Sequence, residues 1–286
     1  MKNIKVIEKN GIQPGKKVVV LAGVHGNESF GVKMLERVIP NLKIISGKVT
    51  FIFANLEAIK QNKRFIDFNL NRCFYKNQPK EIINTLEGKT AREIIPYLEE
   101  TDYMLDIHGT WNPYSVEFII CMPQSFEFAK IIPFEKISWN WDEFEPGSTD
   151  YYMNLKNKIG ICIECGYSKD PESEIRAEES LRNFLIKSGS IRGELTSLKK
   201  QTCYKIINLY KNKYGKFKKS REFADFEKLK EKTLVGFDGK EKIFLYKDDS
   251  LIFIADYENI EEECFLIARE ETLLNTQNLS NSERGN

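Results

Sequence analysis

The first two-thirds of the chain alternates apolar, β-branched runs with amphipathic segments, and this alternation constrains the fold more than any other feature. Residues 17–24 read Lys-Val-Val-Val-Leu-Ala-Gly-Val, a run typical of a strand buried on both faces. Residues 28–38 then place Val32, Leu35 and Val38 on one helical face. Further strands are predicted at 49–54, 103–107, 117–122 and 160–164, and further helices at 90–100, 126–132 and 171–187. This rhythm predicts a mixed α/β sheet flanked by helices.

From about residue 201 the pattern changes to short β-like runs separated by turns. These runs lie at 203–209, 233–235, 242–246 and 251–254. We therefore expect an α/β domain over residues 1–198 and a small all-β domain over 199–274. Residues 275–286 are polar and lack periodicity, so a disordered tail is predicted there.

Charge and composition exclude several classes of function. The chain has 43 basic and 42 acidic residues, so its net charge of +1 recruits neither nucleic acid nor an anionic membrane. No N-terminal segment resembles a signal peptide, and no run of about 18 apolar residues is present to span a bilayer. We expect a soluble cytoplasmic protein with no nucleic-acid or membrane partner. The sequence does not determine its oligomeric state.

The six cysteines are scattered, which is typical of reduced, buried thiols in a chain without a signal peptide. Cys162 and Cys165 form a Cys-x-x-Cys pair that invites a redox or metal-binding interpretation. However, they lie inside a strand-like run, whereas a redox pair lies at a helix N-terminus where the thiolate is stabilised. A structural role is therefore favoured for both.

The only two histidines each follow a predicted strand. His25 follows residues 17–24 in Val-His-Gly-Asn-Glu, and His108 follows residues 103–107 in Asp-Ile-His-Gly-Thr. Open α/β sheets bind ligands at the carboxyl ends of their strands, so the two motifs are expected to meet. A mononuclear catalytic zinc needs three protein ligands and one open position. The sequence therefore predicts a zinc site formed by His25, Glu28 and His108.

The alternative is that these motifs have no role in metal binding. The chain has 42 acidic residues among 286, so a glutamate three positions after a given histidine is unsurprising. Two histidines at strand ends, each followed by glycine and each near a carboxylate, favour the metal site. Asp106 lies on the same strand face as His108, because side chains alternate with period two, and is expected to orient a ligand or the metal-bound water.

Two other features carry possible chemistry. Arg64, Asn71 and Arg72 fall within nine residues, and an arginine grips a carboxylate bidentately in a way that lysine cannot. Alone, this stretch is better explained as a surface loop whose arginines have no chemical role. Glu164 ends an apolar strand before Cys165, which makes it either a costly core residue or a general base at a sheet edge.

Taken together, these motifs resemble the succinylglutamate desuccinylase/aspartoacylase family, a branch of the zinc carboxypeptidase superfamily. The resemblance covers about residues 15–190, and the C-terminal β region resembles the small domain that these deacylases carry. It rests on four motifs in order: His25-Gly26-Asn27-Glu28, Arg64 with Asn71-Arg72, Asp106-Ile107-His108, and Glu164-Cys165-Gly166.

The resemblance implies a role for each motif. It implies one Zn²⁺ per chain, held by the two histidines and the first-motif glutamate, and a small-molecule amide as substrate. It also implies that Arg64 polarises the scissile carbonyl and that Asn71 and Arg72 hold a substrate carboxylate. Glu164 would then be the general acid and base.

This chain departs from the family pattern at two places. The family usually has Asp-x-Asn-Arg, whereas this chain has Asn69 in the first position. Asn69 still accepts a hydrogen bond from a zinc ligand but adds no charge, so a lower metal affinity or activity is expected. Upstream of Glu164, where aspartoacylases carry a second substrate-binding arginine, the chain has Gly-Ser-Thr followed by Asp150. Asp150 is expected to meet a cationic or hydroxyl group of a different substrate.

Three functions remain open on the sequence alone. The first is a zinc-dependent amidohydrolase acting on an N-acylated amino acid or a similar small carboxylate-bearing amide. The second is a metallocarboxypeptidase that trims peptide C-termini, because the same residue set serves both reactions. The C-terminal β domain favours the deacylase, since in that family it narrows the site to small substrates. The third is a non-catalytic ligand-binding protein on the same fold, supported only by Asn69.

Overall fold

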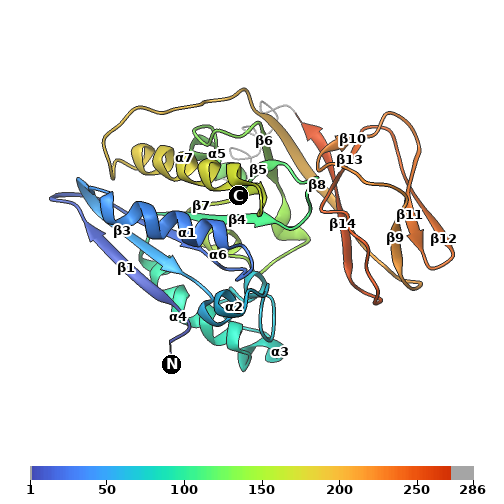
Figure 1. Cartoon of the computed structure of the whole chain (residues 1–286), viewed down its shortest axis with the longest axis horizontal. Helices are drawn as coiled ribbons and strands as arrows, with labels where there is room; N and C mark the ends of the chain where they lie inside the picture. Colours follow the sequence, from blue (N-terminus) through green and yellow to red (C-terminus); the bar gives the residue numbers. More distant parts are fainter. Residues whose placement is uncertain (1, 272–286) are drawn as a thin grey trace, which may run out of the picture.

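The computed structural model describes residues 2–271 (Figure 1). Its α-helices are α1 (Ser29–Val38), α2 (Leu56–Gln61), α3 (Lys80–Ile83), α4 (Leu86–Glu100), α5 (Phe126–Ala129), α6 (Thr149–Leu155) and α7 (Pro171–Lys187). The N-terminal strands are β1 (Lys5–Asn10), β2 (Gln13–Ala22), β3 (Ser46–Phe53), β4 (Tyr103–Thr110), β5 (Glu117–Ile120), β6 (Lys136–Trp139) and β7 (Ile159–Tyr167). The C-terminal strands are β8 (Thr202–Lys211), β9 (Phe217–Lys219), β10 (Glu227–Lys228), β11 (Thr233–Asp238), β12 (Glu241–Leu245), β13 (Asp249–Ile252) and β14 (Glu263–Glu271).

The main sheet is mixed, as predicted. Its strand order is β1-β3-β2-β4-β7-β5-β6-β8-β14-β13-β10. Strands β3, β2, β4 and β7 run parallel, and β5 runs antiparallel to β7. A second, smaller sheet has the order β12-β11-β9. A mixed α/β sheet with a small C-terminal β-sheet is therefore confirmed.

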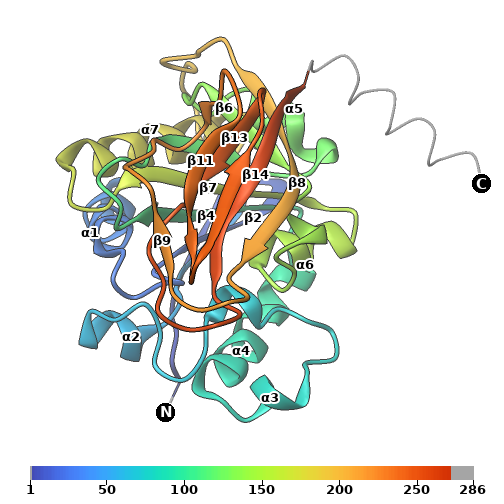
Figure 2. The same ribbon diagram turned by 90° about the vertical axis from the view of Figure 1, so that its right-hand side faces the viewer.

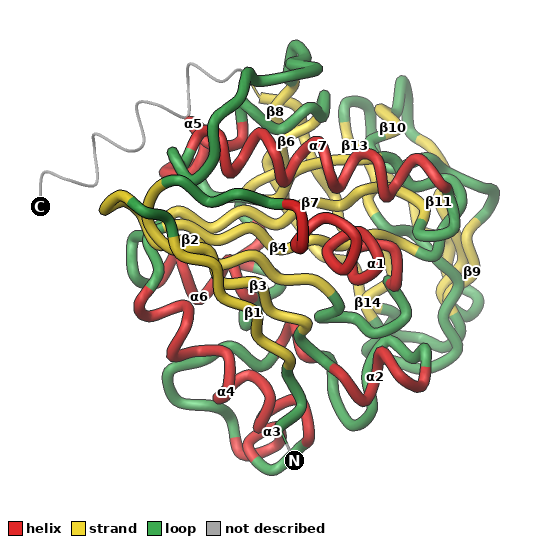
Figure 3. The backbone as a smooth tube through the Cα atoms, turned by 60° about the vertical axis from the view of Figure 1, so that its left-hand side comes forward, coloured by secondary structure: helices red, strands yellow, loops and turns green. Residues whose placement is uncertain are grey.

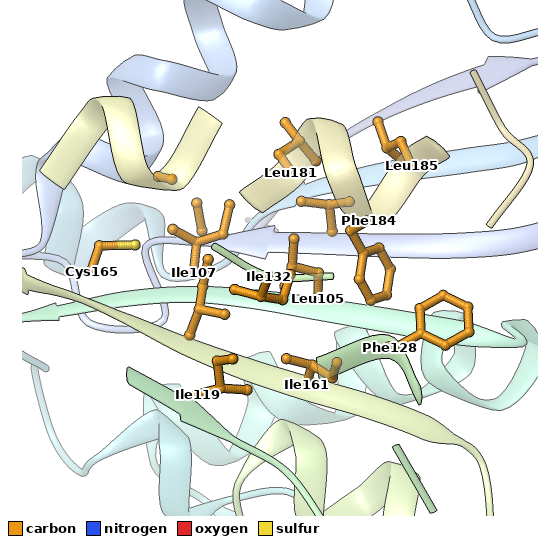
Figure 4. Close-up of a cluster of buried hydrophobic side chains, with 14 of the residues drawn as sticks. Leu105, Ile107, Ile119, Phe128, Ile132, Ile161, Cys165, Leu181, Phe184 and Leu185 are labelled. Carbon is orange, nitrogen blue, oxygen red and sulfur yellow. The ribbon is translucent and has the colours of Figure 1, made fainter. Parts of the chain in front are cut away.

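Both faces of the parallel strands are buried, which explains their continuous apolar sequences. In β2, Val18 and Val20 belong to one core cluster, whereas Val19 and Leu21 belong to another. Helices α1 and α7 cover the first face, and α4 and α6 cover the second (Figure 3). On the first face, strand side chains such as Ile107 pack under α7 (Figure 4). The sheet is thus the middle layer of three.

The C-terminal β region continues the main sheet across the predicted domain boundary. Strand β8 pairs with β6 in parallel, and β14, β13 and β10 then add antiparallel to it. In Figure 1 this region lies on the side toward which the β4 arrow points. Figure 2 views it from its outer side. The predicted boundary between residues 198 and 199 falls between α7 and β8. The predicted tail at 275–286, together with residues 272–274, lies outside the described residues.

Some short elements differ from the sequence-based predictions. The helix predicted at 126–132 ends at Ala129, since Pro133 has no N–H to donate to the Ala129 carbonyl and its ring would clash with that carbonyl in a continued helix. Strand β1 was not predicted, since its sequence Lys-Val-Ile-Glu-Lys-Asn is half exposed at a sheet edge and lacks a long apolar run. Within residues 2–271, no helix combines the length and apolarity needed to cross a membrane.

A shared core joins the C-terminal region to the α/β layer. Phe118 of β5 is fully buried and contacts Trp141, Phe226 and Phe253, with ring centroids 6.2, 4.9 and 5.5 Å away. Phe226 and Phe253 belong to the C-terminal region, so this cluster crosses the predicted boundary.

Replacing Phe118 with alanine is expected to destabilise the whole protein rather than one part. A buried Phe→Ala change costs about 3–5 kcal/mol because it removes apolar contacts and leaves a cavity. Chemical denaturation followed by far-UV circular dichroism and by tryptophan fluorescence should show one coincident, shifted transition. Phe237→Ala, at a 37% exposed position on β11, is the control and should shift stability by less than about 1 kcal/mol. Separate transitions for the two probes would contradict the shared core.

Candidate metal centre and active site

Three predicted ligands converge at the carboxyl end of the parallel strands. His25 lies in the turn after β2, Glu28 directly precedes α1, and His108 lies near the end of β4. The Nδ1 atom of His25 is 2.7 Å from Glu28 Oε1, and the Nδ1 atom of His108 is 3.1 Å from Glu28 Oε2. The two Nδ1 atoms are 3.3 Å apart, and all three side chains are buried.

The turn that carries His25 requires glycine at position 26. A Cβ atom there would lie 2.1 Å from the backbone carbon of Ala58, so no larger residue fits without moving α2. The Gly26 amide also donates to the carbonyl oxygen of Arg64 at 3.2 Å. The same turn therefore positions His25 and ties it to the arginine-bearing loop.

Each histidine has an oxygen acceptor close to its outward-facing Nε2 atom. Asn69 Oδ1 is 3.0 Å from Nε2 of His25, and Asp106 Oδ2 is 3.1 Å from Nε2 of His108. The second contact is an ion pair rather than a hydrogen bond, and Nε2 of His108 has no hydrogen-bond partner among the described residues. Asp106 Oδ2 is itself fixed by the Thr149 hydroxyl at 2.6 Å. These acceptors favour a proton on Nε2 and leave each Nδ1 lone pair facing Glu28.

This donor set fits a divalent cation. The 3.3 Å separation of the two Nδ1 atoms is close to the edge of a tetrahedron whose metal–nitrogen bonds are about 2.0 Å long. His25, Glu28 and His108 each offer one ligand atom, and these three atoms lie within 4.8 Å of one another. A carboxylate and two neutral imidazoles facing one another in a buried site are best stabilised by a cation among them.

The pKa values of His25 and Glu28 agree with this interpretation, whereas that of His108 opposes it. Burial, together with the Arg64 charge, lowers the pKa of His25 to about 4, so its Nδ1 lone pair is available at neutral pH. Burial opposes ionisation of Glu28, but the two histidines hold its pKa well below the usual value. Burial also opposes charge on His108, yet the Asp106 carboxylate raises its pKa. A metal therefore has to compete with a proton at His108.

A second set of possible ligands shares His108. Asp106, His108 and Cys162 also offer atoms within metal-binding distance of one another. A metal would require the thiolate of Cys162, but burial raises the pKa of this thiol well above its ordinary value. The set that contains Glu28, already ionised, is the better cation site.

Glu164 is suited to hold and release a proton beside this site. It lies in β7 directly opposite His108 in the parallel ladder and is only 8% exposed. Its Oε2 atom has no hydrogen-bond partner among the described residues. Burial raises the pKa of Glu164 to about 8; Glu28 adds to the shift, whereas His108 and Arg64 oppose it. A carboxyl group with a pKa near neutrality serves well as a general acid or base.

The structure also brings the predicted substrate-binding residues to the same place. The Arg64 guanidinium is half exposed, and its Nη1 atom lies 3.6 Å from Glu28 Oε1. Asn71 Oδ1 accepts from the Thr149 amide at 3.3 Å. Arg72 forms an ion pair with Glu145 and lies 3.6 Å from Glu263. The guanidinium expected to bind a substrate carboxylate is thus already paired with two carboxylates of the chain.

A cavity of about 750 Å³ opens over the candidate metal centre, between the α/β layer and the C-terminal β region. Its walls include the candidate catalytic residues Arg64 and Glu164. On the C-terminal side the lining residues are Leu209, Phe253, Ile254, Ala255, Tyr257, Glu261, Glu262, Glu263, Phe265 and Leu266. The C-terminal region therefore forms one wall of the site.

Asp150 lies in a smaller recess of about 80 Å³ that adjoins this cavity. Arg64, Arg72 and Glu164 line both spaces. Asp150 is 3% exposed, and its Oδ1 atom accepts from the Ser148 hydroxyl at 2.5 Å. Burial, with a contribution from Asp142, raises the pKa of Asp150 to about 7.

Glu87 is a supporting residue that sequence reasoning missed. This fully buried carboxylate at the start of α4 accepts hydrogen bonds from three consecutive backbone amides, at residues 66, 67 and 68, over 2.7–3.1 Å. It also accepts from Asn55 Nδ2 at 3.2 Å. Glu87 therefore fixes the loop between Arg64 and Asn69. Its sequence context resembles any acidic residue in a first helical turn, so no local signal identifies this role.

Glu87→Gln is expected to loosen that loop. The glutamine amide group would face backbone N–H donors and leave at least one of them without an acceptor, at a cost of about 1–3 kcal/mol. Amide hydrogen exchange should accelerate at residues 66–68, and urea denaturation should report the loss of stability. Lys89→Gln, at an exposed position on the same helix, should change neither. Unchanged exchange at residues 66–68 in Glu87→Gln would show that the carboxylate does not fix the loop.

Solved structures similar to this one share the fold at low sequence identity. A succinylglutamate desuccinylase from Vibrio parahaemolyticus superposes with a TM-score of 0.75 at 17% identity, covering 93% of this chain and 86% of that one. A product-bound structure of the ectoine utilization protein EutE (DoeB) from Ruegeria pomeroyi gives a TM-score of 0.70 at 16% identity, covering 94% and 88%. These likenesses support the fold assignment alone.

Sequence comparison supplies the family. A succinylglutamate desuccinylase from Pseudoalteromonas atlantica is 30% identical over 129 residues, which cover 39% of this chain and 36% of that protein. A probable aspartoacylase from a Nostoc species is 26% identical over 165 residues, covering 52% and 55%. The matches thus span about a third to a half of these relatives. The family sequence model that describes the succinylglutamate desuccinylase/aspartoacylase catalytic domain matches residues 14–173 of this chain. The chain belongs to the succinylglutamate desuccinylase/aspartoacylase family.

Proposed function

We propose that this protein is a zinc-dependent amidohydrolase that cleaves the amide bond of an N-acylated amino acid or a similar small, carboxylate-bearing amide. The observation that carries this proposal is the placement of Glu164, buried and lacking a partner for Oε2, on the cavity wall beside the convergent His25, Glu28 and His108. The names of the relatives, desuccinylase and aspartoacylase, support hydrolysis of an acyl amide.

His25, Glu28 and His108 would hold the metal. Zn²⁺ bound there would supply Lewis acidity toward the carbonyl oxygen and would lower the pKa of a bound water. Asn69 accepts a hydrogen bond from Nε2 of His25, and Asp106 lies against Nε2 of His108. Both contacts keep the Nδ1 lone pairs of the histidines directed at the metal position. One ion per chain is expected, because the two possible ligand sets among the described residues share His108.

Glu164 moves the protons of the reaction. Its carboxylate takes a proton from the attacking water and then delivers it to the leaving nitrogen, so one group serves in turn as base and acid. Its raised pKa suits both steps, because the group is protonated in part at neutral pH. No covalent acyl intermediate is needed. Arg64 donates to the scissile carbonyl oxygen and stabilises the negative charge that develops there.

Asn71, Arg72 and Asp150 hold the substrate. Asn71 and Arg72 bind a carboxylate of the substrate, which has to share Arg72 with the carboxylates already beside it. Asp150 in the recess meets a hydroxyl or cationic group. These assignments orient the amide between Arg64 and Glu164, which line both spaces.

The size of the site favours this reaction over two alternatives. A metallocarboxypeptidase needs an open groove for a peptide, whereas here Phe253, Tyr257 and Phe265 of the C-terminal region form one wall of the cavity. A non-catalytic binding protein has no need of a buried carboxylate without a partner, because such a group is costly to keep.

Glu164→Gln is expected to abolish turnover while preserving metal binding. Loss of a general acid and base lowers kcat by about 10²–10⁴-fold. Steady-state kinetics on a panel of N-acyl amino acids and short peptides, run with elemental analysis, would measure both properties. Glu117→Gln, on the neighbouring strand β5 and outside the cavity, is the matched control and should retain kcat. A near-normal kcat in Glu164→Gln would remove Glu164 from the mechanism, and preferential cleavage of peptides would favour the carboxypeptidase.

Asn69→Asp is expected to tighten zinc binding. A carboxylate behind His25 makes its Nδ1 a stronger donor, and such partners typically change metal affinity by about 10–100-fold. Competition against a chromophoric zinc chelator would measure the dissociation constant. Asn77→Asp adds the same charge at an exposed position away from the site and should leave the affinity unchanged. Equal affinities for the two variants would contradict the role assigned to Asn69.

A further inference from the structure

The small sheet leaves one of its two edges open. Its strand order is β12-β11-β9, and β9 is covered on its outer side, where Phe217 and Tyr257 exchange backbone hydrogen bonds of 2.9 and 3.0 Å. Strand β12, at the far right of Figure 1, pairs with β11 alone among the described strands. An open sheet edge presents backbone N–H and C=O groups with which another extended chain can pair. The edge of β12 is therefore open to a further strand.

The hairpin between β11 and β12 determines which backbone groups lie on this edge. Asp238 pairs with Glu241 across a two-residue turn, and the pair that closes such a turn exchanges backbone hydrogen bonds. Because inward and outward groups alternate along a strand, the N–H and C=O groups of Glu241 and Ile243 face β11. Those of Lys242 and Phe244 consequently point away from it. Neither of these two residues makes a backbone hydrogen bond to another described segment.

Aromatic side chains border this edge on the face that points away from the core. Phe237 pairs with Lys242, two residues before Phe244, so all three side chains share one face. Phe237 and Phe244 are each 37% exposed, and Tyr246, two residues further on, is 59% exposed. Leu245 alternates with these residues and packs into the core on the other face. Exposed apolar side chains gathered on one face are typical of an interaction surface.

Lysines without an acidic partner surround these rings. Lys218 and Lys242 lie on either side of Phe237 in the ladders. The ammonium group of Lys232 lies over the Phe244 ring, 4.7 Å from its centroid. None of these three lysines forms an ion pair with another described residue. The net charge of +1 thus conceals a local excess of positive charge, which favours an acidic partner.

We propose that the β12 edge binds an acidic, extended segment of a partner protein. The segment adds to the small sheet as a strand and exchanges backbone hydrogen bonds with Lys242 and Phe244. Its side chains alternate between the two faces, so acidic residues at every second position lie on the face that carries Lys232 and Lys242. Strand β12 does not line the cavity over the candidate metal centre, so this inference does not depend on the proposed hydrolysis.

Three other occupants fit this surface less well. A second copy of the edge would place its own lysines beside those of the first, and like charges across a strand pair are destabilising. The bases of a single-stranded nucleic acid need open ring faces for stacking, whereas the Lys232 ammonium covers one face of Phe244. An anionic lipid surface has no use for the outward backbone groups of Lys242 and Phe244. An extended acidic peptide uses the charges and the backbone groups together.

Fluorescence anisotropy with a labelled, end-capped peptide of the sequence Thr-Glu-Val-Glu-Val-Glu-Thr tests the proposal on the full chain. The peptide should bind saturably, and added salt should weaken the binding because it screens the charges. A peptide that is N-methylated at its glutamates keeps the charge but cannot donate to the edge, and a peptide with lysine in place of glutamate reverses the charge. Each of these two should bind about tenfold more weakly or worse.

Variants of Lys242 separate the charge from the backbone. Lys242→Gln removes the charge and should weaken binding of the acidic peptide by about fivefold. Lys242→Pro also removes the outward N–H and should weaken binding further, while the pairing with β11 is kept. Lys43→Gln, at an exposed position before β3, is the matched control and should leave the affinity unchanged. Far-UV circular dichroism shows whether each variant keeps its fold.

Four outcomes would overturn the inference. One is the absence of saturable binding of the acidic peptide, and another is an equal affinity of Lys242→Gln and Lys43→Gln for it. The third is tighter, Lys242-dependent binding of oligothymidylate or of phosphatidylserine vesicles, which would assign the face to nucleic acid or lipid. The fourth, by analytical ultracentrifugation, is a wild-type dimer that Lys242→Pro abolishes, which would assign the edge to a second copy of the chain.

Discussion

The parallel pairing of β2, β4 and β7 is the constraint on which the site depends. Ala22 lies beside Ile107 and His108 beside Glu164 in these ladders, so the three strands end at the same edge. The turn after β2 then brings His25 and Glu28 to that edge. Continuous apolar packing on both faces fixes this register, because a one-residue slip would send every strand side chain to the opposite face. The position of Glu164 relative to His25, Glu28 and His108 is therefore set by the core.

Around this edge, polar groups position the side chains to which we assign contact with the metal or the substrate. Asn69 and Asp106 lie behind the histidines, Glu87 fixes the loop that carries Arg64, and Glu145 pairs with Arg72. Asp106 and Glu87 are fully buried, where a hydrogen bond or ion pair restricts side-chain motion most strongly. The C-terminal strands add Glu263 and one wall of the cavity. Orientation of the reactive groups thus draws on both parts of the chain.

The sequence predicts where the candidate metal ligands lie along the chain, because strand periodicity and a turn glycine depend only on neighbouring residues. His25, His108 and Glu164 could each be assigned to a strand end without knowledge of the neighbouring strand. The partners of Arg72 could not be predicted, since Glu145 and Glu263 lie 73 and 191 positions away and no local pattern encodes such pairs. The same holds for Glu87, and for the pairing of β8 with β6 that extends the sheet across the predicted boundary. Long-range pairing depends on tertiary packing, which local propensity does not specify.

Metal stoichiometry tests the central claim most directly. Elemental analysis of the protein after zinc loading and removal of free metal should give about one zinc per chain in the wild type and none in His25→Ala or His108→Ala. Cys162→Ala should keep its zinc, because the thiol belongs to the alternative ligand set. Zinc retained in His25→Ala but lost in Cys162→Ala would place the metal in the alternative set formed by Asp106, His108 and Cys162. A wild-type protein that takes up no zinc would contradict the account of the site.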